Sequence, residues 1–121
     1  MNSRRKGKDG ELRLVKKLKE YGYDVRRGQQ YSGANGDADV VGIDHLHIEV
    51  KYCANGHGST YEWIEQSKRD AKADEIPVVM HKKVSSADRG NEWLVTLRLD
   101  DFMSMWSEYD YETQHRFNKS N

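Results

Sequence analysis

Asp39, Glu49 and Lys51 have the residue types and spacing for chemistry on a phosphodiester bond. Glu49 and Lys51 lie two residues apart in a segment, 46–52, whose polar and apolar residues alternate. Side chains two apart on a strand point to the same face. The other face carries Leu46, Ile48 and Val50, so it is expected to face the core. A carboxylate and an ammonium group therefore project together from one face.

Asp39 lies on the preceding segment, and a hairpin would bring it to the same place. If Asp44 and His45 form the turn, the residue numbers of two paired residues in the hairpin add up to about 89. Asp39 then lies near Val50 or Lys51. Two carboxylates and a backbone carbonyl, that of Val50, are oxygen ligands that suit Mg²⁺. A bound ion would polarise a phosphate and acidify a water molecule.

Other interpretations of these residues remain open. Lys51 would orient the attacking water or stabilise charge that grows on the phosphate. Alternating charges on a strand more commonly form a solvated face or a cross-strand ion pair. The histidines at 45, 47, 57 and 81 do not form a zinc-site spacing with Cys53.

The order of the motifs resembles the PD-(D/E)XK nucleases. The segment from Ser32 to Val41 reads SGANGDADVV, and Ile48–Lys51 reads IEVK. The resemblance covers roughly residues 4–82 and is nearest to archaeal-type Holliday junction resolvases and their phage relatives. It implies a restriction-endonuclease-like α/β core, in which helices flank a central mixed sheet. It also implies a metal-dependent endonuclease that uses Mg²⁺, for which Mn²⁺ can substitute.

The resemblance also assigns roles to individual residues. Asp39 takes the aspartate position, Glu49 the acidic position and Lys51 the lysine position. Glu11 is the acidic residue of the first helix, which helps to bind metal through water, and Gln66 is the helix glutamine near the site. Two points depart from the pattern or compete with it: Ala38 replaces the usual proline, and Asp37 competes with Asp39 as the ligand.

The elements that would position these residues follow the order α-β-β-β-α-β-β-α. The expected helices cover residues 9–21, 61–74 and 101–109, with Asp9, Thr60 and Asp100 as N-caps. The expected strands are 23–27, 38–43, 46–52, 78–84 and 92–98. We expect residues 1–8 to form a basic arm, 28–36 a loop, and the tail beyond Tyr111 to be frayed.

Composition places the chain in a broad class. The 121 residues predict one domain, 1–121, with a mean hydropathy of −1.01. No apolar run is long enough to span a membrane, and a single cysteine fits a reducing environment. We therefore expect a cytoplasmic protein of a bacterium, an archaeon or a phage-infected cell.

The charge distribution favours a nucleic-acid partner. The net charge is zero, but residues 1–27 carry ten Lys and Arg against four Asp and Glu, whereas residues 85–121 carry four against seven. A solvated helix face would explain the basic half equally well. The candidate DNA contacts are Arg4, Arg5, Lys6 and Lys8 in the arm, with Tyr31 and Ser32 in the loop.

The resemblance implies a structure-selective DNA endonuclease that acts on Holliday junctions or other branched DNA. The alternatives are a nicking or flap-cutting repair nuclease of the same superfamily, and a DNA-binding module without catalysis. Two cuts across a junction need two sites, so we expect a homodimer. The apolar residues offered for its interface are Trp93, Val95, Leu97, Phe102, Met105 and Trp106, although burial within the monomer is an equal alternative.

Overall fold

The computed structural model describes residues 3–29, 38–53, 59–84 and 92–119, without the side chains of residues 3–6 and 117–119. Its elements are α1 (Ser3–Glu20), β1 (Arg26–Arg27), β2 (Val40–Val41), β3 (Leu46–Cys53), α2 (Thr60–Asp70), β4 (Ile76–Lys83), β5 (Leu94–Thr96) and α3 (Leu99–Lys119). The order expected from the sequence is therefore confirmed, as is the α/β class with a mixed sheet flanked by helices. Within the described residues, the predicted basic arm is wrong: residues 3–8 are part of α1.

The five strands form one sheet in the order β1-β2-β3-β4-β5. The pairs are antiparallel except for β3 and β4, which run parallel and are joined through α2. Val40 pairs with Ile48, so paired positions of the hairpin sum to 88, one less than the sequence suggested. His45 in the turn has a φ of 69°, as the reversal there requires.

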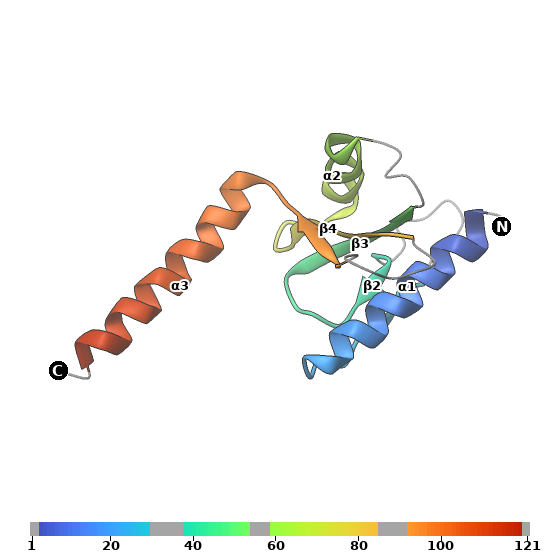
Figure 1. The fold of residues 1–121 in the computed structure, drawn as a ribbon. Helices are drawn as coiled ribbons and strands as arrows, with labels where there is room; N and C mark the ends of the chain where they lie inside the picture. Colours follow the sequence, from blue (N-terminus) through green and yellow to red (C-terminus); the bar gives the residue numbers. More distant parts are fainter. Residues whose placement is uncertain (1–2, 30–37, 54–58, 85–91, 120–121) are drawn as a thin grey trace.

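Two helices cover the two faces of this sheet (Figure 1). α1 packs on the face that carries Ile48, and the main core consists of Leu14, Val15, Leu18, Val25, Val40, Ile48, Val78 and Met80. Gly10 lets α1 approach β3 closely, because a Cβ there would lie 2.5 Å from the Cβ of Tyr52. α2 packs on β3 and β4 through Ile64 and Ser67. The buried Ser67 hydroxyl donates to the carbonyl oxygens of His47 (3.2 Å) and Val78 (3.4 Å).

Several element boundaries differ from the sequence predictions. Asp9 lies inside α1 and caps nothing, because the helix begins six residues earlier. Gly22, with a φ of +95°, follows the end of α1 as expected. The N-cap of α2 is Ser59 rather than Thr60: its side chain accepts a hydrogen bond from Tyr61 N at 3.1 Å.

α3 differs most from its prediction. It starts at Leu99, so Asp100 is inside the helix, and it continues through the predicted frayed tail to Lys119. The helix extends away from the sheet (Figure 1). In the described parts of the chain, no helix is long and apolar enough to cross a membrane.

Candidate active site

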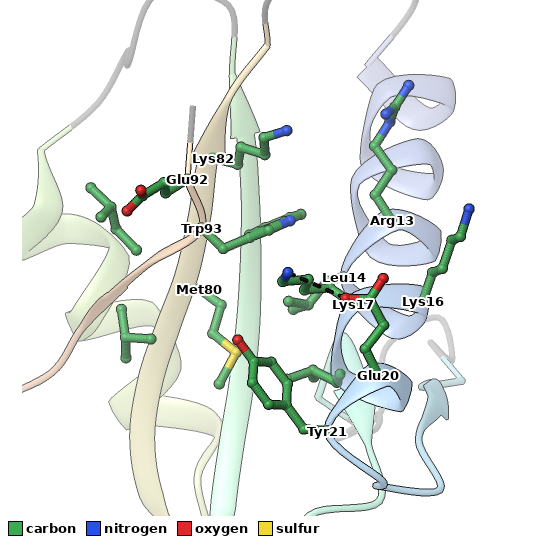
Figure 2. Close-up of a pocket in the computed structure, with 13 residues that line it drawn as sticks. Arg13, Leu14, Lys16, Lys17, Glu20, Tyr21, Met80, Lys82, Glu92 and Trp93 are labelled. Atoms are coloured by element: carbon green, nitrogen blue, oxygen red, sulfur yellow. Dashed lines mark ion pairs between the residues drawn. The ribbon is translucent and has the colours of Figure 1, made fainter. Parts of the chain in front are cut away.

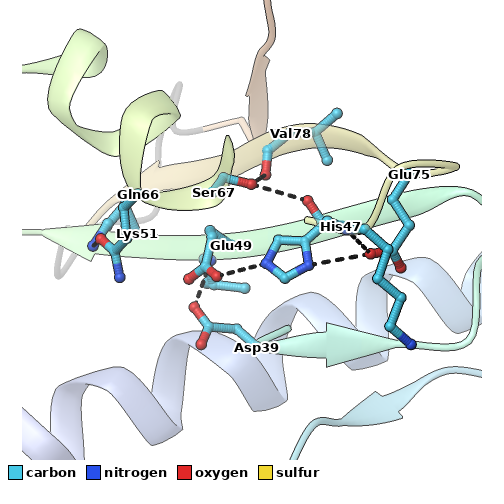
Figure 3. Close-up of polar contacts among 10 residues, drawn as sticks. Asp39, His47, Glu49, Lys51, Gln66, Ser67, Glu75 and Val78 are labelled. Carbon is cyan, nitrogen blue, oxygen red and sulfur yellow. Dashed lines mark hydrogen bonds and ion pairs between the residues drawn. The ribbon is translucent and has the colours of Figure 1, made fainter. Parts of the chain in front are cut away.

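The candidate site lies on the sheet face beneath α2, where β3 presents His47 and Glu49 (Figure 3). This face is not solvated: His47 is 3 % exposed and Glu49 is 5 % exposed. An ordinary charged strand face would be open to water, and burying a carboxylate has a cost unless it is hydrogen-bonded or paired. The solvated-face interpretation of the alternating charges is therefore wrong at Glu49.

Asp39 and Glu49 lie side by side (Figure 3). Asp39 directly precedes β2, and the pairing of Val40 with Ile48 places Asp39 across from Glu49. Its Oδ2 accepts a hydrogen bond from the backbone N–H of Val50 at 2.9 Å, so the expected position near Val50 is confirmed. The backbone carbonyl of Asp39 accepts a hydrogen bond from Gly28 N at 2.9 Å. This bond holds the backbone of Asp39 next to the end of β1.

The two carboxyl groups share a proton. Burial and the neighbouring Glu49 charge raise the pKa of Asp39 to about 7, and Glu11 adds to the effect. Burial alone would raise the pKa of Glu49 too, but hydrogen bonds from His47 and Asp39 outweigh it and hold that pKa below its usual value. At neutral pH Glu49 is therefore ionised, and Asp39 is the group that exchanges a proton.

His47 holds the Glu49 carboxylate from the other side. Its Nε2–H donates to Glu49 Oε1 at 3.1 Å, while Nδ1 lies 3.7 Å from Glu75 Oε1. The hydrogen bond to Glu49 raises the pKa of His47. His47, Glu49 and Asp70 also bring one potential ligand atom each within 4.8 Å of one another. An ion could thus contact Glu49 on either side, through Asp39 or through His47 and Asp70.

Lys51 and Gln66 form a second polar pair next to the carboxylates. Lys51 Nζ donates to Gln66 Oε1 at 3.1 Å, and both residues are half-buried. Gln66 is on α2, directly before the buried Ser67 that fastens this helix to β3 and β4. The ammonium group is therefore held on the same face as Glu49, two residues along β3.

Glu11 approaches the site from α1, but its strongest contact is with a cation. Glu11 Oε1 accepts from Arg27 Nε at 2.9 Å, and its side chain is 17 % exposed. Its negative charge nevertheless contributes to the raised pKa of Asp39. The structure thus brings together the residues that the sequence analysis had assigned to catalysis and to the metal: Glu11, Asp39, Glu49, Val50, Lys51 and Gln66.

Apart from Lys8, the remaining candidates are residues or side chains that the structure does not describe. Asp37, Tyr31 and Ser32 lie outside the described residues, so the choice of Asp39 over Asp37 stays a prediction. Arg4, Arg5 and Lys6 are on the first turns of α1, but their side chains also lie outside the described part. Lys8 is exposed on the same helix.

His47 is the residue that the sequence analysis missed. The histidines were compared only with a zinc-site spacing, which is a pattern along the chain. The alternation of residues 46–52 had already put His47 on the face of Glu49, two positions away. Contact with Glu75 could not have been anticipated in this way, because it depends on how the chain returns after α2.

The donor set fits a hard divalent cation. Asp39 and Glu49 would carry two neighbouring negative charges, one half-buried and one buried, if neither held a proton, and an ion could take the place of the shared proton. No family model matches the sequence, and no curated protein is significantly similar to it.

Proposed function

We propose that this chain is a divalent-metal-dependent DNA endonuclease of the PD-(D/E)XK type, with a restriction-endonuclease-like core. The observation that carries the proposal is the pair of Asp39 and Glu49 carboxyl groups, the first half-buried and the second buried, next to the Lys51 ammonium group. A protein that only binds DNA gains nothing from placing two acidic groups side by side, one of them buried, where phosphates would approach. The five-stranded mixed sheet flanked by helices supports the same proposal.

In this proposal Asp39 and Glu49, with the carbonyl of Val50, hold Mg²⁺ or Mn²⁺. The bound ion supplies charge to the scissile phosphate and lowers the pKa of a coordinated water. His47 keeps Glu49 ionised and oriented through its Nε2–H. Arg27 holds Glu11, and Gln66 holds Lys51, so that two further charged groups are fixed before DNA arrives.

Lys51 has the role of stabilising negative charge that develops on the phosphate. Its ammonium group is anchored by a neutral partner, the Gln66 amide oxygen at 3.1 Å, rather than by an exposed carboxylate. The positive charge is therefore available to an incoming phosphate. The nearest acidic neighbour along the strand, Glu49, is engaged by His47 and Asp39.

We propose branched DNA, such as four-way junctions, as the substrate. A panel of labelled four-way, flap, nicked and linear DNAs, each with Mg²⁺, Mn²⁺, Ca²⁺ or excess chelator, tests both parts. Expected results are cutting of branched DNA with Mg²⁺ or Mn²⁺, binding with little cutting in Ca²⁺, and no cutting in chelator. Preferential cutting of flaps or nicked duplexes would favour the nicking or flap-cutting alternative.

Variants identify the site in the same assay. Asp39→Asn, Glu49→Gln and Lys51→Ala should each reduce cutting by at least about 100-fold, since each removes a group that acts on the reacting phosphate or its ion. Asp44→Asn is the matched control, because Asp44 is an exposed carboxylate in the turn between β2 and β3. Full activity of both Glu49→Gln and Lys51→Ala would place the active site elsewhere. DNA binding without cutting under every metal condition would leave the binding-module alternative.

A further inference from the structure

α3 has an apolar face that nothing in the described monomer covers. Leu99, Phe102, Trp106 and Tyr109 recur at intervals of three and four residues, so they share one side of the helix. Ring contacts show the same alignment: the ring centroids of Phe102 and Trp106 are 6.3 Å apart, and those of Trp106 and Tyr109 are 5.2 Å apart. These four side chains are 44 to 72 % exposed.

A helix of this kind needs a partner. An isolated helix has little stability in water, and most helices in proteins are held by the packing of their apolar face. α3 is 21 residues long and extends away from the sheet (Figure 1). Contiguous exposed aromatic and aliphatic side chains on such an element mark an interaction surface.

The same chain has an open groove on the α1 side of the sheet, between α1 and the β4–β5 edge (Figure 2). Its volume is about 690 Å³, and none of the candidate active-site residues lines it. The floor is apolar, with Leu14, Leu18, Met80 and Trp93, and it continues into Leu94 and Val95 of β5, which are 56 % and 51 % exposed. Leu14, Leu18 and Met80 belong to the core and are at most 9 % exposed, so the apolar surface offered to α3 is mainly that of Leu94 and Val95.

The charges of the groove and of α3 are complementary. The rim of the groove carries Arg13, Lys16, Lys17 and Lys82 against Glu20 and Glu92. Residues 99–112 of α3 carry five acidic residues and no basic one: Asp100, Asp101, Glu108, Asp110 and Glu112. Asp110 lies about 40° around the helix from Trp106, beside the apolar face, so it can meet the basic rim when that face lies on the groove.

The connection between β5 and α3 is short. α3 begins only three residues after Thr96, the last residue of the strand that borders the groove. Local bonds hold the first turn of the helix: Phe102 N–H donates to Arg98 O at 3.0 Å and Arg98 Nε donates to Asp101 Oδ2 at 2.8 Å. The helix runs away from the sheet (Figure 1), and the two residues between Thr96 and Leu99 leave little length for it to turn back onto its own groove.

We propose that two copies of this chain exchange their α3 helices, so that α3 of each copy occupies the groove between α1 and β5 of the other. The contact is the same in both directions, which closes a twofold dimer. Because the contact occurs twice, two apolar helix faces and two grooves are buried together. The proposal uses surfaces remote from Asp39 and Glu49 and does not depend on the proposed function.

Sedimentation of the full chain at micromolar concentration should show twice the mass of the chain. Trp106→Ser should shift the protein to monomer, because it removes the central side chain of the apolar face. The matched control is Tyr111→Ser, at an exposed tyrosine that lies about 140° around the helix from Trp106. Circular dichroism would verify that both variants keep their helices. A monomeric wild-type chain would overturn the proposal.

Charge reversal separates helix exchange from simple pairing of two α3 helices. One variant carries Asp110→Lys on α3, beside the apolar face, and the other carries Lys16→Glu and Lys17→Glu on the groove rim. With exchange, each variant alone is monomeric, but an equal mixture restores dimers, since both contacts in the mixed pair join opposite charges. If the groove variant alone stays dimeric, the α3 helices pair with each other and the exchange is refuted.

Discussion

Asp39 holds a proton in the folded protein that it would release at neutral pH in the unfolded chain. Its pKa is raised from 3.8 to about 7 by burial and by Glu49. A carboxyl group with a raised folded pKa stabilises the fold at low pH, and this contribution is lost as pH rises from about 4 to about 7. The metal-free protein should therefore lose stability across that range on account of Asp39.

Asp39→Asn should remove this dependence. The amide keeps an oxygen for the Val50 N–H and offers an N–H to Glu49, but it cannot ionise. We expect a higher melting temperature than wild type at pH 8 without metal, and a smaller difference at pH 4. Added Mg²⁺ should raise the melting temperature of the wild type only. If Asp39→Asn were less stable than the wild type at pH 8, the conclusion that Asp39 and Glu49 share a proton would be wrong.

His47 is expected to act as a positioning residue through Glu49. His47→Leu keeps an apolar volume but removes the donor 3.1 Å from Glu49 Oε1, which should weaken the apparent affinity for Mg²⁺ by about 10- to 100-fold. The loss should be recovered at high Mg²⁺, so that the metal requirement changes more than the maximal rate. His47→Gln, which retains an N–H, should restore much of the affinity.

The Asp70→Asn variant tests whether His47 orients Glu49 or binds the metal ion directly. If an ion is held by His47, Glu49 and Asp70, loss of the Asp70 charge should weaken metal binding as much as His47→Leu does. If His47 only orients Glu49, Asp70→Asn should have little effect, because Asp70 is exposed and lies outside the Asp39–Glu49 pair. Calorimetric titration with Mn²⁺ measures both variants without DNA.

At the scale of single elements, α1 reaches the sheet because Gly10 has no side chain. A Cβ at Gly10 would lie 2.5 Å from the Cβ of Tyr52, too close for any real contact. Gly10→Ala should therefore force α1 and β3 apart and lower the free energy of unfolding by about 1–3 kcal/mol, measured by urea denaturation.

Gly7→Ala is the matched control on the same helix. The nearest atom to a Cβ at Gly7 would be Glu11 Oε2, at 4.0 Å, so the methyl group meets no clash. Alanine has the better helix propensity, and this variant should gain up to about 1 kcal/mol. Equal destabilisation by both substitutions would show that helix propensity, not contact with Tyr52, determines the result.

The elements differ in how far the sequence determines them. Alternation identified β3, because a strand with one face on the core and the other bearing Glu49 and Lys51 has a period of two. The range predicted for α3 is too short because the residues after Tyr111 are polar, a pattern typical of a frayed end. No glycine or proline occurs after Gly90, so nothing in the sequence stops that helix.

The site shows the same limits. The hairpin register placed Asp39 near Val50 from spacing alone, and Lys51 and Gln66 were both named as site residues. Burial of the Glu49 face was not predicted, because it is produced by α2 packing across β3 and β4. Contacts between elements distant in sequence, such as His47 with Glu75 or Glu11 with Arg27, depend on the assembled fold.

At the scale of the whole molecule, a net charge of zero conceals two oppositely charged helices. α1 carries Arg4, Arg5, Lys6 and Lys8 near its start, whereas α3 is acidic over residues 99–112. The exchange proposed above would cover the acidic helix with the basic rim of a second copy. The beginning of α1 would then remain as a basic surface for DNA.

Salt dependence tests whether that surface binds the phosphate backbone. Each phosphate that a basic side chain neutralises releases counterions and steepens the dependence of log K on log salt by about 0.9. Changing Arg4, Arg5, Lys6 and Lys8 to Gln should therefore lower the magnitude of the slope by about 3–4 and weaken binding to all DNA sequences alike, because phosphate contacts do not read bases. Lys19→Gln is the control, since this lysine is at the other end of α1, about 16 Å along the helix from Lys8, and does not line the groove. The slope should be unchanged in the control. An unchanged slope in the fourfold variant would show that the start of α1 does not contact DNA, whatever the activity of the site at Asp39 and Glu49.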